Sequence, residues 1–205
     1  MNNGERFNSL SHLAGTILAV GGTATLVVMA AFKEDAWKIV SFSIYGATLI
    51  ALYLFSTLYH SARGTREVLL RKLDHTAIYL LIAGSYTPFT LVTLRGPVGW
   101  TLFGSIWGLA VLGIVVDVLL GSRRRIIPVV LYLLMGWLVV FTLKPLLRAL
   151  PLNGFWWLLA GGVLYTGGVV FYALEKKLPY SHGIWHLFVL GGSIAQFMAI
   201  FFYVL

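Results

Sequence analysis

The sequence predicts an all-α membrane protein, a bundle of seven transmembrane helices forming a single domain over residues 1–205. Apolar side chains make up 59% of the chain and charged ones only 11%, whereas soluble domains average about 45–50% and about 25%. The mean hydropathy is +0.88. Seven stretches without Lys, Arg or Glu are each 18 to 23 residues long, and a helix needs about 20 residues to cross a bilayer. Lipid is therefore the expected solvent.

The predicted spans follow one another along the chain with short, mostly charged connections. They are Leu10–Phe32, Ile39–Tyr59, Thr76–Leu94, Trp100–Leu120, Ile126–Leu143, Phe155–Leu174 and Ile184–Leu205. None alternates polar and apolar residues as a β-barrel strand would. The first span is long enough to cross the membrane and has no small-residue cleavage site after it, so we expect no cleaved signal peptide. The chain has no cysteine, which excludes disulfides and thiolate metal sites.

Basic residues predict the orientation of the bundle. The side that carries the N-terminus has ten Lys and Arg residues: Arg6, Arg63, Arg66, Arg71, Lys72, Arg123, Arg124, Arg125, Lys176 and Lys177. The opposite side has five: Lys33, Lys38, Arg95, Lys144 and Arg148. Because cytoplasmic loops are enriched in Lys and Arg, we expect a cytoplasmic N-terminus and an extracytoplasmic C-terminus in the inner (plasma) membrane. The net charge of +8 then reflects basic loops, and no nucleic-acid partner is expected.

All five histidines fall at the predicted cytoplasmic ends of the spans. His182 and His186 are four residues apart, so on a helix they lie one turn apart on the same face. Such a pair can bind one metal ion, although the glutamate of the HExxH metalloprotease motif is absent. His60 offers a third nitrogen from another helix, and three histidines leave a fourth position for water at a catalytic zinc ion. Polar packing at a helix end is the alternative interpretation of the pair.

Two oxygen-bearing side chains belong to the same predicted site. Ser56 lies one turn before His60 on the same helix face, where its hydroxyl could orient a water molecule or stabilise an oxyanion. The alternative for Ser56 is a hydrogen bond to a carbonyl of its own helix. Asp74 could bind the metal, or act from just outside the coordination sphere as a general base. An ion pair with Arg71 or Lys72 is the alternative for Asp74.

The two remaining histidines are expected to lie outside the metal site. Adjacent helical residues point about 100° apart, so Asp74 and His75 should not both face one site. We expect Asp74 to face inward and His75 to lie at the membrane interface. His12 is expected to line the same cavity without binding the metal.

The order of these elements resembles the hemolysin III family, bacterial relatives of the progestin and adiponectin receptors (PAQR). The resemblance rests on Ser56–His60, on Asp74-His75 leading to Gly84–Phe89, and on Pro179–His186, together with Glu5, Asn8, Ser11 and His12. It implies a seven-helix bundle with a zinc site facing the cytoplasm. His60, His182 and His186 would be the zinc ligands, Asp74 would hold the water that completes the coordination, and Ser56 would lie beside it.

The resemblance also implies what the protein acts on. The wider superfamily includes alkaline ceramidases, which have a similar set of residues, so we expect zinc-dependent hydrolysis of a lipid amide or ester. The expected partners are the bilayer and a membrane lipid or lipid-derived substrate, in a process linked to membrane-lipid homeostasis. A receptor or sensor with structural zinc is a second interpretation, and a haemolysin-type pore is a third. Nothing in the sequence resembles a selectivity filter or a ring of charges through the spans.

Overall fold

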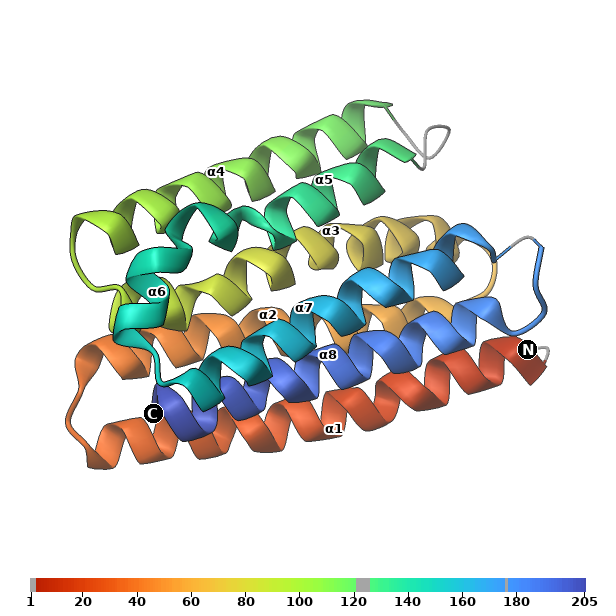
Figure 1. The fold of residues 1–205 in the computed structure, drawn as a ribbon. Helices are drawn as coiled ribbons and strands as arrows, with labels where there is room; N and C mark the ends of the chain where they lie inside the picture. The colour runs from red at the N-terminus through yellow and green to blue at the C-terminus, as the bar shows by residue number, and fades with distance from the viewer. Residues whose placement is uncertain (1–2, 121–125, 176) are drawn as a thin grey trace.

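The computed structural model describes residues 3–120, 126–175 and 177–205, and these residues form helices and short connections without a strand (Figure 1). Seven helical stretches are long and apolar enough to cross a membrane, as predicted. Large apolar side chains face outward on the bundle; Phe32, Leu119 and Phe141 are 84%, 78% and 86% exposed. A surface of this kind is stable in lipid, so the protein is a multi-pass membrane protein. Arg123–Arg125 and Lys176, which contribute to the orientation prediction, lie outside the described residues.

The helices run in the predicted order. They are α1 (Asn3–Phe32), α2 (Ala36–Ser61), α3 (Thr65–Pro88), α4 (Pro97–Leu120), α5 (Ile126–Gly136), α6 (Leu143–Ala149), α7 (Leu152–Ala173) and α8 (Ser181–Tyr203). A π-helical turn at Phe89–Thr93 extends α3 directly after Pro88, whose ring removes one backbone hydrogen bond. The fifth span differs from the prediction of one helix ending at Leu143. It is divided between α5, a 3₁₀ turn at Leu138–Thr142, and α6.

The third span begins much earlier than predicted. The apolar stretch predicts a start at Thr76, but α3 begins at Thr65. The intervening segment is rich in Leu, Arg, Lys and Glu, which are good helix formers. The helix therefore continues beyond the apolar stretch, and Asp74 lies inside α3 rather than at its start.

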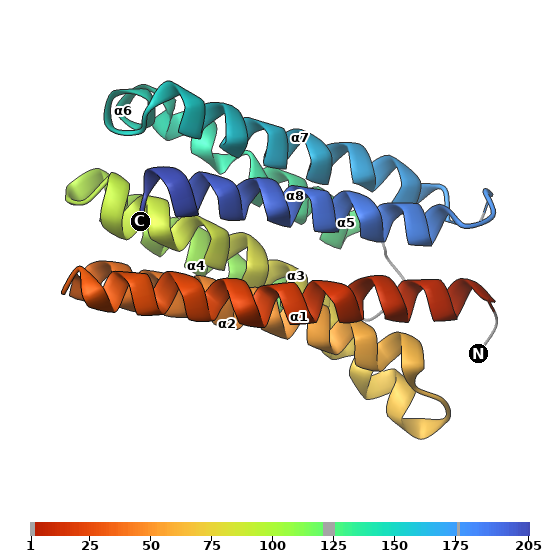
Figure 2. The ribbon, with the colours of Figure 1, turned by 90° about the horizontal axis from the view of Figure 1, so that it is seen from below.

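The helices surround a central space. Neighbouring helices are in contact in the order α1, α2, α3, α5, α7, α8 and back to α1, while α4 packs on the outside of α3 and α5. Figures 1 and 2 show the long helices side by side and the two termini at opposite ends of the bundle. The N-terminal end of α1, the C-terminal end of α2 and the N-terminal ends of α3 and α8 therefore meet at the same end.

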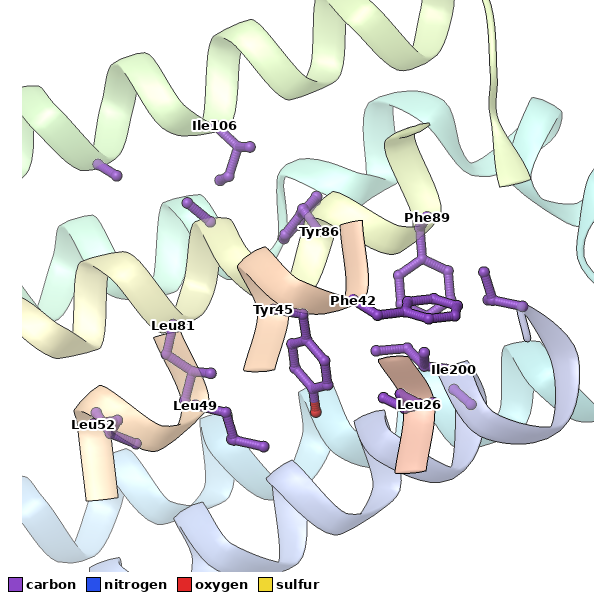
Figure 3. Close-up of a cluster of buried hydrophobic side chains, with 14 of the residues drawn as sticks. Leu26, Phe42, Tyr45, Leu49, Leu52, Leu81, Tyr86, Phe89, Ile106 and Ile200 are labelled. Atoms are coloured by element: carbon purple, nitrogen blue, oxygen red, sulfur yellow. The ribbon is translucent and has the colours of Figure 1, made fainter. Parts of the chain in front are cut away.

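Close packing of α1, α2, α3 and α8 forms the core of the bundle. Figure 3 shows buried side chains from these helices in contact, among them Leu26, Phe42, Tyr45 and Ile200. Glycines allow the helices to approach: a methyl group added at Gly46 would overlap with Thr23, and one at Gly84 would overlap with Thr48. Small residues at helix contacts are the usual means of close packing in membranes. This packing holds the ends of α2 and α8 in a defined position relative to each other.

The odd number of spans leads to a topological prediction. A reporter fused after Leu205 should be extracytoplasmic, and one inserted at Arg124 should be cytoplasmic, because the N-terminal side carries the larger number of basic residues. Reporter activity or accessibility to a membrane-impermeant reagent in whole cells measures both. Detection of the two reporters on the same side of the membrane would contradict the arrangement of seven spans.

Candidate metal centre

Three histidines from two helices meet at the end of the bundle that carries the N-terminus. His60 lies in the last turn of α2, and His182 and His186 lie in the first turns of α8. One ring nitrogen from each histidine lies within 4.8 Å of the other two, a group that could hold a metal ion. The Nε2 atoms of His60 and His182 are 3.4 Å apart. His60 and His186 are buried, and His182 is partly exposed.

The opposite nitrogen of each ring has its own acceptor. The Nδ1 pairs are His60 with Glu5 Oε2 at 2.7 Å, His182 with Glu175 Oε2 at 3.0 Å, and His186 with the Asn8 carbonyl at 3.3 Å. When Nδ1–H donates these hydrogen bonds, the lone pair of each Nε2 is available for a cation. Histidines that bind metals almost always donate their other N–H to a carboxylate or carbonyl. The site is therefore compatible with metal binding in its outer contacts as well as in its ligands.

Asp74 and Ser56 line a cavity directly beside the histidines. The Asp74 carboxyl group lies within interaction range of both Ser56 and His182. The Ser56 hydroxyl oxygen is buried and has no hydrogen bond of standard geometry in the described part of the chain. Among the ion pairs found between described residues, none joins Asp74 to Arg71 or Lys72. The carboxyl group and the hydroxyl thus lie close together beside the histidines, and both residues border the cavity.

The cavity extends from the histidines into the bundle. Its volume is about 180 Å³, and its walls come from α1, α2, α3, α5, α7 and α8. A second cavity of about 150 Å³ lies farther along, with mostly apolar walls. The two share six lining residues: Ser85, Tyr86, Gly136, Trp137, Gly162 and Gln196. Together they form a space with a polar end at the histidines and an apolar interior.

Comparison with known proteins identifies the family. Residues 1–197 match the family described as "Haemolysin-III related". The chain belongs to this family. It is 48% identical to "Hemolysin-3" of Bacillus cereus over 202 residues, covering 98% of this chain and 92% of that protein. It is 44% identical to "Hemolysin-3 homolog" of Bacillus subtilis (strain 168), covering 97% and 93%.

The chain is also similar, at lower identity, to a protein from animals. "Monocyte to macrophage differentiation factor" of Homo sapiens is 30% identical over 205 residues, covering 96% of this chain and 82% of that protein. These similarities confirm the resemblance drawn from the sequence motifs, including the relation to the PAQR proteins. The candidate metal centre is thus part of a haemolysin-III fold that extends over nearly the whole chain.

The remaining two histidines of this haemolysin-III protein both reach the cavity. His12 is buried, its ring is stacked on that of His186 with centroids 3.7 Å apart, and it meets Tyr53 edge-on. It lines the cavity, as expected, and the group of three that could hold a metal does not include it. His75 differs from the expectation that it lies only at the interface, since it also contributes to the cavity wall. The cavity is wide enough at this end for both Asp74 and His75 to border it.

Sequence reasoning missed the groups that orient the histidines. The sequence patterns place Glu5 and Asn8 only among the residues that resemble the family, whereas in the structure the Glu5 carboxylate approaches His60 and the Asn8 carbonyl approaches His186. Glu175 was not assigned a role. Three of the four glutamates, Glu5, Glu67 and Glu175, lie at the same end of the bundle as the histidines, a signal that could have suggested Glu5 and Glu175. A backbone carbonyl such as that of Asn8 leaves no signal in the sequence.

These outer contacts lead to a prediction for the haemolysin-III metal centre. Glu5→Ala and Glu175→Ala should each weaken metal affinity by about 10- to 100-fold, the usual effect of removing a group that orients a metal-binding histidine. Competition with a chelator of known affinity measures the change. Glu67→Ala, which removes an exposed glutamate in the first turn of α3, is the matched control. Unchanged affinity in both variants would show that these carboxylates do not orient the ligands.

Proposed function

We propose that this haemolysin-III protein is a zinc-dependent membrane hydrolase that cleaves an amide or ester bond of a lipid. The observation that carries the proposal is the convergence of three imidazoles beside Asp74 and Ser56 at the polar end of an apolar cavity. Imidazole ligands suit zinc, as they do copper, iron and nickel. A tetrahedral zinc with Zn–N bonds of about 2.0–2.1 Å holds two nitrogens about 3.3–3.4 Å apart. The separation of 3.4 Å between His60 and His182 Nε2 fits this geometry.

Each residue of the centre has a role in the proposed reaction. His60, His182 and His186 would hold the ion, which when bound supplies Lewis acidity and lowers the pKa of a water molecule toward about 7. Asp74 accepts a proton from the attacking water as the water oxygen bonds to the substrate carbonyl carbon. Ser56 donates a hydrogen bond to the oxyanion that develops on the carbonyl oxygen. The carbon–nitrogen or carbon–oxygen bond then breaks, and Asp74 returns the proton to the leaving amine or alcohol.

The shape of the cavity supports a lipid as the substrate. An acyl chain would occupy the apolar interior while its carbonyl group lies among the polar side chains at the histidine end. Binding an apolar chain in a concave apolar pocket with a few polar groups is a common recognition mode. In the proposed orientation the centre faces the cytoplasmic side of the cell inner (plasma) membrane, so the substrate is a membrane lipid or a molecule derived from one.

One observation favours a receptor-like alternative. The three histidines come from α2 and α8, so a zinc ion bound to them would also join these helices and stabilise the bundle. A purely structural role for the zinc ion, however, does not explain why Asp74, Ser56 and a cavity lie beside the histidines. The hydrolase accounts for all of these features.

Turnover by the purified protein tests the proposal. The zinc-loaded protein, reconstituted in vesicles with a broad panel of lipid amides and esters, should release a fatty acid from at least one of them. Removal of the metal by a chelator should abolish release, and added zinc should restore it. Mass spectrometry measures the released fatty acid and the amine or alcohol that remains. If a zinc-loaded preparation cleaves none of the panel, the hydrolase is excluded for these lipids and the structural role is favoured.

A further inference from the structure

Three residues of the described cavity walls carry buried polar atoms with no hydrogen-bond partner in the described chain. They are His12, Ser56 and Gln196. The first two lie at the metal centre, where a polar substrate group is expected. Gln196 follows His186 by ten residues on α8, and at 1.5 Å per residue it lies roughly 15 Å farther along the helix axis. The proposed hydrolysis uses no polar group at that depth.

The Gln196 side chain is held at the junction of the two cavities. It is only 7% exposed and lines both of them. Its Nε2 donates a hydrogen bond to the Leu158 carbonyl on α7 at 3.4 Å. It packs on Gly161 of α7, where an added Cβ would lie 2.9 Å from Nε2. These contacts hold the amide nitrogen, which donates to Leu158, while the acceptor, Oε1, has no hydrogen-bond partner in the described part of the chain.

Neighbouring polar groups in the same region are paired with each other. The Tyr165 hydroxyl bonds to Ser193 at 2.8 Å, and Thr166 donates to the Gly162 carbonyl at 2.7 Å. The Tyr86 hydroxyl lies 2.7 Å from the Gly136 carbonyl. Beyond the junction the walls are formed by residues such as Phe155 and Leu158. Among the six described residues that line both cavities, Gln196 is the one whose buried side-chain oxygen has no partner.

We propose that the junction is a ligand subsite in which Gln196 Oε1 accepts a hydrogen bond from a hydroxyl group in the interior of an acyl chain. This inference rests on the proposed function, because the chain would enter with its carbonyl end at the metal centre. A site with a buried hydrogen-bonding group discriminates against a ligand that leaves the group unpaired. The preferred ligand class is therefore a hydroxylated lipid chain rather than a fully apolar one.

Positional isomers of hydroxystearate test this subsite, with stearate as the unsubstituted reference. Their affinities for the purified full-length protein are measured by competition against labelled stearate. We expect isomers hydroxylated near mid-chain to bind about 2- to 10-fold more tightly than stearate, the effect of one net hydrogen bond. Isomers hydroxylated next to the carboxylate or at the far end should show no such gain. Gln196→Met should remove the preference while stearate binding persists.

Two further variants make the test independent of the folding of one mutant. Gly161→Ala should shift the Gln196 amide from the adjacent helix and reduce the same preference. Thr25→Val, which changes an exposed hydroxyl on α1 outside both cavities, should retain it. Stearate binding without any positional preference in the wild type would overturn the subsite and leave the lipid hydrolase standing. A preference for mid-chain hydroxyl groups that persists in Gln196→Met would also overturn the subsite. Absence of binding by stearate and all isomers would contradict the lipid-binding function itself.

Discussion

Purified His182→Ala and His186→Ala variants are each expected to lose most of their zinc, while the wild-type protein retains about one ion per chain. Each substitution removes one of three nitrogens that lie within 4.8 Å of one another. Two nitrogen ligands cannot hold tetrahedral zinc tightly. Elemental analysis after gel filtration in metal-free buffer measures the retained ion. The expected result is a fall from about one ion per chain to a small residual fraction.

His75→Ala is the matched control for the metal experiment. His75 borders the same cavity but does not belong to the group of three, so its removal should leave the zinc content unchanged. The variants should also be compared by thermal unfolding, since loss of an ion bound to α2 and α8 lowers the stability of the folded state. Full zinc retention in both the His182 and His186 variants would show that these residues are not ligands.

Asp74→Asn is expected to reduce lipid hydrolysis by about 10²-fold or more while zinc content and thermal stability change little. The substitution preserves the shape of the side chain but removes the base, and general-base catalysis typically contributes about 10²- to 10⁴-fold. The comparison requires a lipid that the wild type cleaves. The rate of fatty acid release from this lipid is measured for the variant and the wild type at equal zinc loading.

Asp117→Asn is the control for this substitution. Asp117 is the carboxylate inside α4, and it does not line either cavity, so turnover should not change. If Asp74 binds the metal or supports the fold, zinc content or melting temperature should fall together with activity. A rate equal to that of the wild type would exclude Asp74 as the base.

The number, order and approximate position of the spans could be predicted because each depends on local composition. An apolar stretch of 18 to 23 residues must form a helix in lipid, since every backbone polar group has to be satisfied within the segment. The ends of the helices were less predictable. At α3 the charged segment that starts at Thr65 continues the helix, because helix formation does not stop where hydropathy changes. In the fifth span a 3₁₀ turn interrupts the helix inside an apolar stretch, so hydropathy gives no sign of it.

Part of the candidate site was also readable from the sequence. The spacing of His182 and His186 places both on one helix face, and alternation of the spans brings His60 and Asp74 to the same end of the bundle. These inferences need only the helical repeat and the direction of each helix. They state which residues share an end of the bundle, but not how far apart their atoms are.

By itself, then, the sequence determined the membrane class, the seven spans and the set of polar residues at one end. Only the tertiary structure decided which of these residues meet. It paired Glu5, Glu175 and the Asn8 carbonyl with the three histidines, and it joined two cavities at Gln196. The physical reason is that spans are selected by local hydropathy, whereas hydrogen bonds and cavities depend on how helices distant in sequence approach and rotate against one another.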